Sequence, residues 1–526
     1  MSEHPAGEGA RPAWAKVIDQ TRCIGCHACT TACKSENVVP VGVTRTYVKH
    51  VDVGVWPQAR RAHQVTRCNQ CAHAPCVAAC PTSAMFQRPD GIVDFDKSIC
   101  IGCKACMAAC PYDAIFINPE DHSAEKCNFC AHRIDVGLEP ACVVVCPVEA
   151  LLVGDLNDPA SRVAEIVGRQ PVGVRRPEKE TLPKVFYRGA HQATLDPLAA
   201  RRPAGGLFMW SEQKLDRETV TSGNPAFNNT SAAALLSYDV PHSLPWDWRV
   251  SLYTWTKSVA AGAYLVSALL LVYFFFDGPA PGYPQTGEHY QTSRLWLWAT
   301  PVISGAFLAL TGGLLIWDLE HPARFYMIFT RPHWRSWLVK GAFIIAAYSL
   351  VLALHFGATA AHVTDGSTPQ MLLVPFGLPL AALTAVYTAY LFAQAKARDL
   401  WQNPLLPPHL FVQAVLAGSA ALAIASVWVG PQFTEALLRV LGASCLVHLL
   451  LVWGEATLTH PTAHARLAVR EMTRGRYRVF FRAGLLLAAA GLFAPWLGLP
   501  AAALALAGLL CHEHAYVQAG QSVPLA

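Results

Sequence analysis

The sequence lacks an export signal at its start and almost lacks cysteine beyond residue 146. The first eight residues, Met1 to Glu8, are polar and contain no twin-arginine pair. Without such a signal we expect the chain to avoid oxidising compartments, where disulfide bonds form. Only Cys445 and Cys511 follow residue 146, so sixteen of the 18 cysteines lie in the first part of the chain. This distribution disfavours a disulfide framework and indicates metal ligands.

The sixteen cysteines form four groups of four, and three groups end in Cys-Pro. The groups are Cys23, Cys26, Cys29, Cys33; Cys68, Cys71, Cys76, Cys80; Cys100, Cys103, Cys106, Cys110; and Cys127, Cys130, Cys142, Cys146. In bacterial iron–sulfur proteins the run Cys-x2-Cys-x2-Cys-x3-Cys-Pro binds one cluster with three cysteines and a second cluster with the fourth. Four groups therefore predict four [4Fe–4S] clusters.

The spacing within the groups favours iron–sulfur clusters over zinc. Three cysteines on a tight loop can contact one face of a cubane, and the fourth ligand must come from elsewhere. Met107 to Pro111 predicts a short helix that carries Cys110 toward a second cluster and stops at the proline. Thiolates also suit zinc, so four zinc sites are the alternative. Zinc sites, however, usually join two separated pairs and do not need the triplets that begin at Cys23 and Cys100.

Two compact groups and two stretched groups suggest a duplicated two-cluster module. Over residues 15–165 the pattern resembles the four-cluster electron-transfer subunits of the complex iron–sulfur molybdoenzymes, such as the beta subunits of polysulfide, dimethyl sulfoxide and formate oxidoreductases. The resemblance implies an α+β ferredoxin-like domain over residues 1–165 with four ligand sets. These sets would be Cys23, Cys26, Cys29 with Cys146; Cys127, Cys130, Cys142 with Cys33; Cys100, Cys103, Cys106 with Cys80; and Cys68, Cys71, Cys76 with Cys110.

The second half of the chain reads as a membrane domain. Charged residues make up 15% of the 526 residues and hydrophobic residues 53%, and the apolar fraction rises after about residue 250. Apolar runs of about 18 residues or more predict an all-α polytopic domain over residues 246–526. Its eight predicted transmembrane helices are residues 250–276, 295–317, 337–357, 371–393, 409–429, 435–455, 479–499 and 500–518. Small residues such as Gly262, Gly312 and Gly313 would let neighbouring helices approach closely.

Basic residues in alternate loops predict the orientation. Arg324, Arg331 and Arg335 follow the second predicted helix, and two further basic clusters follow the fourth and sixth. By the positive-inside rule these loops, and with them the amino-terminal domain, face the cytoplasm of a bacterial inner membrane. Residues 166–245 are rich in proline, arginine and polar residues without periodicity. They predict a linker that either contacts a partner or is a disordered tether.

The membrane half carries two motifs of a known family. Asp318-Leu-Glu-His-Pro-Ala-Arg-Phe325 resembles the Asp-Leu-x-x-Pro-x-Arg-Phe signature of the NrfD, or polysulfide-reductase membrane-subunit, family. The first predicted helix, which begins near Trp246-Asp-Trp-Arg249, resembles that family too. The resemblance implies a pair of four-helix bundles that exchange electrons with quinone near the iron–sulfur side of the membrane.

Ionisable residues inside the predicted helices are candidates for the quinone site. Lys257 could donate a hydrogen bond to a quinone carbonyl, or its ammonium group could reach back to the membrane surface. Asp318 and His321 are the preferred proton exchangers because a quinone reaction moves two protons with two electrons. Arg324 lies with them at the end of the second helix, and an Asp318–Arg324 pair that holds the loop is the alternative.

Aromatic and further polar residues extend this candidate set. Tyr253 and Trp248 would line the quinone pocket or belong to the aromatic belt at the membrane surface. A proton path could continue through Glu455, His448, His512 and Glu513. Haem is disfavoured because the predicted depths of His355 and His448 in the membrane do not match.

The sequence therefore predicts a fused electron-transfer and quinone-reactive subunit of a membrane-bound oxidoreductase. The chain has no domain large enough for pterin chemistry, so the substrate would react on a partner subunit with a molybdenum- or tungsten-pterin. The predicted cytoplasmic orientation favours electrons flowing from formate or sulfite to quinone. Two alternatives remain open, namely a nickel–iron hydrogenase partner, and a membrane half that serves as an anchor or a redox-coupled ion pump.

Overall fold

The computed structural model describes residues 11–54, 57–201, 234–276, 291, 293–361 and 369–525. The chain divides into two compact units. The first consists of residues 1–245 together with 395–397 and 523–526, and the second consists of residues 246–394 and 398–522. The main boundary falls between Pro245 and Trp246, where the membrane domain is predicted to begin.

A four-stranded sheet in the first unit has one side that faces cysteines and one side covered by a helix. Its order is β8 (Leu151–Asp155), β1 (Trp14–Asp19), β10 (Val185–Arg188), β9 (Val172–Gly173), with β1 parallel to β10 and antiparallel to β8. Side chains alternate along a strand. Ala15 and Val17 therefore pack against α6 (Arg162–Arg169), whereas Lys16 and Ile18 lie on the side of Cys142.

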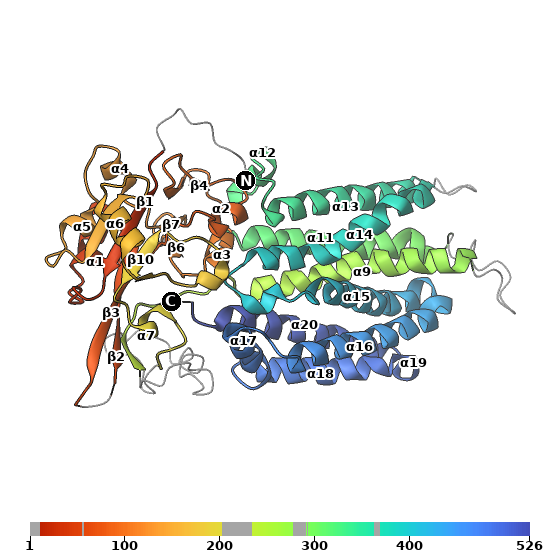
Figure 1. Cartoon of the computed structure of the whole chain (residues 1–526). Coiled ribbons are helices and arrows are strands. Elements are labelled where there is room, and N and C mark those ends of the chain that lie inside the picture. Colours follow the sequence, from red (N-terminus) through yellow and green to blue (C-terminus); the bar gives the residue numbers. More distant parts are fainter. Residues whose placement is uncertain are drawn as a thin grey trace. The chain divides into compact units, whose positions relative to one another are not determined.

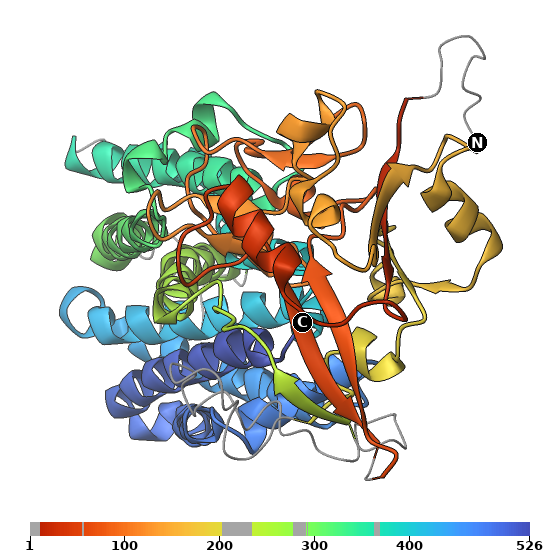
Figure 2. The same ribbon diagram turned by 90° about the vertical axis from the view of Figure 1, so that its left-hand side faces the viewer.

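A long hairpin forms the core of the second sheet. Strands β2 (Thr46–Val53) and β3 (Arg60–Arg67) pair antiparallel from Thr46 opposite Arg67 to Val53 opposite Arg60. Strand β11 (Ala234–Tyr238) pairs with the other edge of β2. The hairpin and its third strand are visible in Figure 2. This register places Arg67 at the end of β3, directly before Cys68.

Two copies of a small helix-and-hairpin motif carry the middle cysteines. In the first, α2 (Pro75–Ala79) leads to Cys80 and the hairpin of β4 (Met85–Gln87) and β5 (Val93–Phe95). In the second, α3 (Ala105–Ala109) leads to Cys110 and the hairpin of β6 (Ile115–Ile117) and β7 (Ala124–Lys126). The two helices pack together through alanine side chains. The predicted short helix that ends at Cys110-Pro111 is confirmed, and so is a first domain of strands and helices.

Much of the segment predicted as a linker is folded. Within residues 166–245, strands β9 and β10 complete the four-stranded sheet and β11 completes the three-stranded sheet. Residues 202–233 lie outside the described residues. The structure thus differs from the predicted linker at these strands. The strands are two to five residues long, too short for their alternation to stand out from the surrounding proline and polar residues.

His242 holds the end of this folded segment in place. Its ring nitrogens lie 2.6 Å from Asp113 Oδ2 and 3.2 Å from Asp239 Oδ1. Burial lowers the pKa of His242, but the two carboxylates outweigh burial and raise it to about 9. The imidazole is therefore charged at neutral pH. Its ion pair with Asp113 ties residues 239–242 to the loop after Cys110.

The second unit is built from long apolar helices that lie alongside one another (Figure 1). The longest are α9 (Trp248–Phe276), α11 (Thr300–Trp317), α13 (Trp337–Ala360), α14 (Pro369–Gln394), α15 (Leu406–Val429), α16 (Thr434–Thr457) and α20 (Leu499–Ser522). A π-helical turn, Leu295–Ala299, extends α11 at its start. The unit also contains the shorter α12 (Met327–Thr330), α17 (Ala463–Thr473), α18 (Arg478–Leu492) and α19 (Ala494–Leu497).

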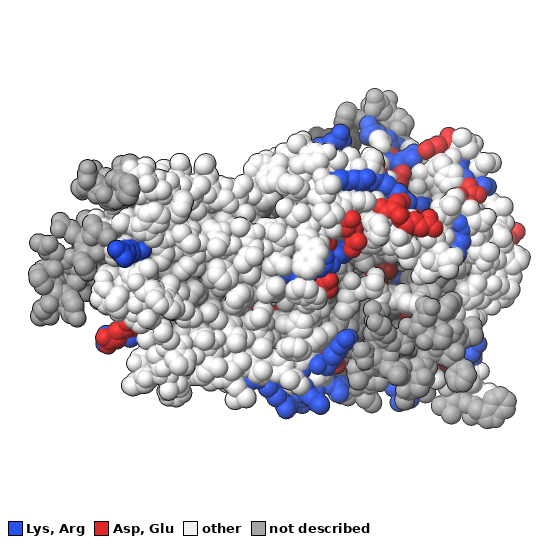
Figure 3. All heavy atoms as spheres, turned by 180° about the vertical axis from the view of Figure 1, so that it is seen from behind, with Lys and Arg blue, Asp and Glu red and all other residues white. Residues whose placement is uncertain are grey.

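Six of the described helical segments are long and apolar enough to cross a membrane. They are Trp248–Tyr273, Leu295–Trp317, Trp337–Ala360, Gln370–Gln394, Leu406–Val429 and Pro431–Thr457. Figure 3 shows a broad surface over the long helices with almost no charged side chains. An all-α second domain with six candidate membrane spans among the described residues is thus confirmed. The seventh and eighth predicted spans correspond to α18, which has 15 residues, and α20, neither of which is among these six.

Glycine lets α9 and α15 pack with their backbones in contact. A Cβ atom added at Gly262 would lie 1.7 Å from the carbonyl oxygen of Ala414, and one added at Gly418 would lie 2.0 Å from the carbonyl carbon of Gly262. By contrast, a Cβ atom at Gly312 or Gly313 would have no described neighbour within 4 Å. The expectation of close helix packing therefore holds at Gly262 and not at the two glycines of α11.

Replacing Gly262 by alanine should destabilise the second unit because the added methyl group forces α9 away from α15. Overpacking of this kind costs about 1–3 kcal/mol, or roughly 5 °C in Tm. Gly313→Ala is the matched control, since its methyl group meets no described atom. Thermal unfolding in detergent, followed by circular dichroism, compares the two. Equal Tm values would contradict the packing described here.

Candidate metal centres and quinone site

Four cysteines from three parts of the first unit line one cavity. Cys33 comes from α1 (Ala28–Glu36), Cys142 from α5 (Ala141–Val144), and Cys127 and Cys130 from the loop after β7. The cavity contains about 240 Å³ of empty space, including its open mouth. Burial, followed by the charges of Cys127 and Cys142, raises the pKa of Cys33 to about 12. The four cysteines are the members of one ligand set implied by the resemblance.

A second cavity is lined by another of the implied sets. Cys80 follows α2, and Cys100, Cys103 and Cys106 lie at and before α3; all four border about 360 Å³ of space. The peptide N–H of Met85 donates to Cys80 Sγ at 3.3 Å, and that of Ala124 donates to Cys100 Sγ at 3.4 Å. Such bonds stabilise thiolates and the charge of a bound cluster.

Side-chain packing groups the cysteines of the remaining two sets. Cys110 lies in one buried cluster with Cys68, Cys71 and Cys76, and Cys23 and Cys146 pack against a cluster that contains Cys29. Burial and then the charge of Cys68 raise the pKa of Cys110 to about 12. Burial raises the pKa of Cys23, and Cys146 and Cys26 act on it in the same direction. The peptide N–H of Ala150 donates to Cys146 Sγ at 3.2 Å. Cysteines far apart in sequence therefore line two cavities and pack together in two buried clusters.

The residues around these sulfur atoms fit metal clusters better than free thiols. Four buried thiols that raise one another's pKa cannot all ionise unless a positive centre lies among them. Arg67, which lines the cavity with Cys142, has two guanidinium nitrogens, Nε and Nη2, that are buried without a hydrogen-bond partner among the described residues. The sulfide ions of a cluster would be acceptors for these donors.

The set of Cys33, Cys127, Cys130 and Cys142 has a cationic environment. Arg67 Nη1 donates to Cys142 Sγ at 3.1 Å, and Lys16 Nζ donates to the same atom at 3.5 Å. Burial raises the pKa of Cys142, but these two cations outweigh burial and lower it to about 7. Both are buried in the sheets, at the register positions described above. The sequence analysis missed both residues, although Arg67 directly precedes Cys68.

In the second unit, Lys257 points inward rather than toward the membrane surface. Its side chain is fully buried. The ammonium group donates to the carbonyl oxygen of Ala385 at 2.7 Å and to Thr388 Oγ1 at 3.0 Å, both on α14. The alternative that Lys257 reaches back to the interface is therefore wrong. The lysine stays available as an intramembrane donor.

Tyr253 lies on the same face of α9 as Lys257, one turn before it. Its side chain is buried, and its hydroxyl group has no hydrogen-bond partner among the described residues. Arg249 lies one further turn back, so Arg249, Tyr253 and Lys257 form a row about 12 Å long. Trp248, by contrast, is 50% exposed and contacts Trp317 edge to face, as a residue of the aromatic belt would.

Asp318 lies at the carboxyl end of α11 and pairs with a residue of α9. Arg249 Nη2 is 3.3 Å from Asp318 Oδ1, and Arg249 Nη1 donates to the carbonyl oxygen of Trp317 at 2.7 Å. His321 precedes the short 3-10 turn Pro322–Arg324, which Arg324 ends. Asp318 and Lys257 thus lie at opposite ends of the row on α9. The sequence analysis did not expect Arg249 to be the partner of Asp318.

The four residues of the suggested proton path lie close together, with a histidine that the sequence analysis overlooked. His409 Nδ1 is 3.0 Å from Glu455 Oε1, and its Nε2 is 2.9 Å from His448 Nδ1. His512 and Glu513 are buried beside them on α20. His409 follows two prolines at the start of a predicted span, and only the fold brings it to the others.

Comparisons with known proteins match both units. Residues 14–35 match the family "4Fe-4S binding domain", and residues 62–156 match "4Fe-4S dicluster domain". Residues 238–524 match the family "Polysulphide reductase, NrfD". Iron–sulfur binding in the first unit and the membrane family of the second unit are therefore confirmed.

These similar proteins match between 32% and 44% of this sequence. A tetrathionate reductase subunit of Salmonella typhimurium is 44% identical over 211 residues, which cover 38% of this chain and 81% of that protein. A polysulfide reductase subunit of Wolinella succinogenes is 40% identical over 173 residues, 32% of this chain and 91% of that protein. A putative dimethyl sulfoxide reductase iron–sulfur subunit of Halobacterium salinarum is 36% identical over 260 residues. These residues cover 44% of this chain and 95% of that protein.

Replacing Arg67 by glutamine should lower the reduction potential of the centre held by Cys142. Reduction adds negative charge, and the variant removes a buried positive charge that is hydrogen-bonded to a ligand. The loss of such a charged hydrogen bond corresponds to about 100 mV for a one-electron couple. Redox titration followed by electron paramagnetic resonance measures the shift.

The control for this measurement lies on the same strand. Arg61 is exposed and pairs with Asp52 at the far end of β3. Arg61→Gln should leave all potentials unchanged. A potential that moves by the same amount in both variants, or in neither, would rule out the assigned role of Arg67.

Proposed function

We infer the function of this protein from its family and its first unit: it belongs to the polysulphide reductase NrfD family, and 4Fe-4S domains precede that membrane part. We propose that it is the electron-transfer and quinone-reactive subunit of a membrane-bound oxidoreductase. The observation that supports this proposal is that cysteines from distant groups line two cavities and pack together in two buried clusters. One polypeptide would thus pass electrons between quinone and a partner.

We propose that the first unit holds four [4Fe–4S] clusters. Each would take three cysteines of one group and one cysteine of another, in the sets already described. A cluster of this type accepts and releases single electrons over a wide range of potentials set by its surroundings. The protein would supply the thiolates, the N–H donors to their sulfur atoms and, at Cys142, the charges of Lys16 and Arg67.

The partner would carry the substrate chemistry on a molybdenum- or tungsten-pterin. Relatives of the first unit bear the names of tetrathionate, polysulfide and dimethyl sulfoxide reductases. They give no support to the formate or sulfite donor that the sequence analysis favoured. We therefore propose reduction of an oxidised sulfur compound at the partner, with quinol as the electron donor. Nickel in the purified complex would favour a hydrogenase partner instead.

The quinone would react along the row of Arg249, Tyr253 and Lys257. A quinol that is oxidised gives up two electrons and two protons. Lys257 donates to Ala385 and Thr388, and its third N–H, for which the described residues show no hydrogen-bond acceptor, would bind a quinone oxygen. Asp318 and His321 would take up protons near the end of α11, and Arg249 and Arg324 would hold the charge of Asp318 in balance.

In the membrane we propose eight spans arranged as two four-helix bundles, with α18 and α20 as the last pair. The basic loops after the second, fourth and sixth spans support a bacterial inner-membrane protein whose iron–sulfur unit faces the cytoplasm. A membrane half that is only an anchor or a redox-coupled ion pump is the competing function. It differs from the proposal in needing no quinone contact at Lys257.

Replacing Lys257 by methionine should lower quinol oxidation at least tenfold, because the variant removes a buried donor to the reacting oxygen. Asp318→Asn should also slow quinol oxidation and shift the pH dependence of its rate, because an amide cannot exchange a proton. The measurement is quinol-dependent reduction of the clusters, followed by visible absorbance in the purified complex. Lys340→Met is the control, because Lys340 also lies in a candidate span but stacks on Trp337.

Full quinol turnover in both Lys257→Met and Asp318→Asn would favour the anchor or pump. Cluster reduction by dithionite checks that each variant retains its electron-transfer unit. Unchanged iron content excludes a folding defect as the cause of any loss.

A further inference from the structure

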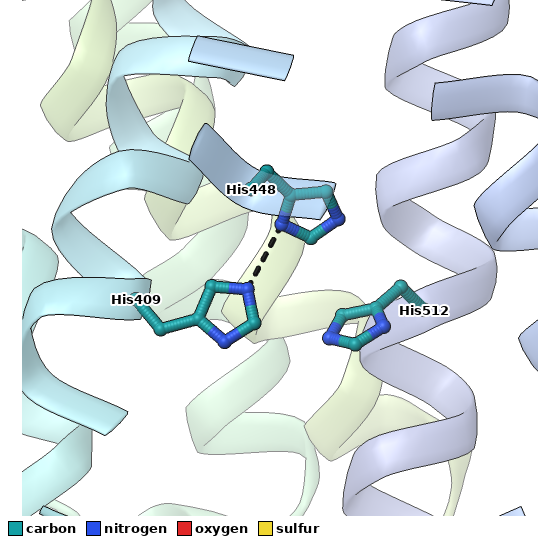
Figure 4. A group of neighbouring side chains, drawn as sticks. All are labelled: His409, His448 and His512. Carbon is teal, nitrogen blue, oxygen red and sulfur yellow. Dashed lines mark hydrogen bonds between the residues drawn. The ribbon is translucent and has the colours of Figure 1, made fainter. Parts of the chain in front are cut away.

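Three histidines from three helices meet inside the second unit. His409 lies on α15, His448 on α16 and His512 on α20, and Figure 4 shows their rings turned toward one another. One nitrogen atom of each lies within 4.8 Å of the others. The ring centroids are 5.0 to 5.4 Å apart, and no side chain of the three is more than 3% exposed.

A carboxylate fixes the orientation and the tautomer of His409. Glu455 Oε1 lies 3.0 Å from His409 Nδ1, so this nitrogen carries the proton and donates it to the carboxylate. His409 Nε2 is then a lone-pair acceptor, and His448 Nδ1 lies 2.9 Å from it. A carboxylate behind an imidazole is the usual outer partner of a metal-binding histidine, because it orients the ring and makes it more basic.

Two buried carboxylate oxygens around this cluster have no hydrogen-bond partner among the described residues. They are Glu455 Oε2 and Glu513 Oε1. Glu455 contacts His409 through its other oxygen, and Glu513 follows His512 on α20. Buried polar groups normally have partners. Glu513 also faces the ammonium group of Lys257 on α9. The unpartnered oxygen of Glu455, whose other oxygen contacts His409, indicates that a positively charged ligand belongs beside the three buried imidazoles.

We propose that His409, His448 and His512 bind one divalent transition-metal ion of the zinc class. Imidazole suits zinc and its neighbours in the first transition series, and three histidines with one open position form a known zinc site. Nitrogen atoms bound to a tetrahedral zinc ion lie about 3.3 Å apart, so the three rings need to shift by about 1 Å. The ion would join α15, α16 and α20.

The chemistry of the site is consistent with its surroundings. Binding through His448 Nδ1 displaces the proton that this atom shares with His409 Nε2, and the proton moves to His448 Nε2, so the ring stays neutral. Glu455 and Glu513 balance the charge of the ion inside the helices. A haem fits poorly, because three rings with centroids 5.0 to 5.4 Å apart leave no room for its macrocycle.

Metal analysis of the intact complex tests the proposal. The complex is purified from zinc-replete cells with an affinity tag that contains no histidine, and zinc and iron are measured together. About one zinc per chain is expected. His512→Gln should lose this zinc and keep its iron, which separates the site from zinc misplaced at cysteines. His355→Gln is the matched control, since His355 is a buried histidine of α13 outside the cluster.

Cobalt alone provides a second readout. Co²⁺ added to zinc-depleted complex should give the intense visible absorption of tetrahedral coordination, and His512→Gln should abolish it. Glu455→Gln should bind zinc about 10–100-fold more weakly in competition with a chelator. If His512→Gln fails to accumulate, His448→Gln and Glu455→Gln give the same comparison. Zinc content equal in the wild type and in these variants, or no cobalt absorption, would overturn the proposal.

The proposed metal site and the proposed quinone reaction are tested by separate readouts. Zinc content and cobalt absorption are measured without quinone, whereas the Lys257 variants are measured by quinol turnover. A zinc-free wild type with full quinol turnover therefore removes only the metal site.

Discussion

A [4Fe–4S] cluster requires one thiolate on each of four iron atoms, and the first unit is organised around this requirement. A short loop supplies three thiolates, so the fourth must come from a distant part of the chain. The folded segments bring Cys33 to the loop of Cys127, and Cys110 to the group of Cys68. Three features of the fold hold these distant cysteines in place. They are the hairpins, the short helices that end in Cys-Pro, and the parallel pairing of β1 with β10.

The same requirement determines the electrostatics of the first unit. Buried thiols raise one another's pKa, so each group of four needs positive charge nearby. At Cys142 the protein itself contributes Lys16 and Arg67, which arrive from two different sheets. In the second unit the ionisable side chains of Lys257, Glu455 and Glu513 are buried among apolar helices, where a charge without a partner is costly. Backbone contact at Gly262 and Gly418 brings α9 and α15 close enough for these polar side chains to share one interior.

Features that depend on local spacing could be predicted from the sequence. The cysteine runs, the helix that stops at Pro111, the unit boundary near Trp246 and six apolar spans all follow from residues within about twenty positions of one another. Features that depend on pairing between distant segments could not. Strand β10 becomes recognisable as a strand only through its pairing with β1. His409 becomes a candidate only through its contact with His448. The inward direction of the Lys257 side chain becomes evident only through its hydrogen bond to Thr388. The Arg249–Asp318 pair joins two helices whose facing sides the sequence does not specify.

Iron and acid-labile sulfide in the purified complex test the central claim most directly. Four complete clusters correspond to about sixteen iron and sixteen sulfide per chain. Cys110→Ser should lower the iron and sulfide contents by the amount of one cluster, because Cys110 is proposed as the fourth ligand of the cluster held by Cys68, Cys71 and Cys76. About four zinc ions per chain with no labile sulfide would contradict the account.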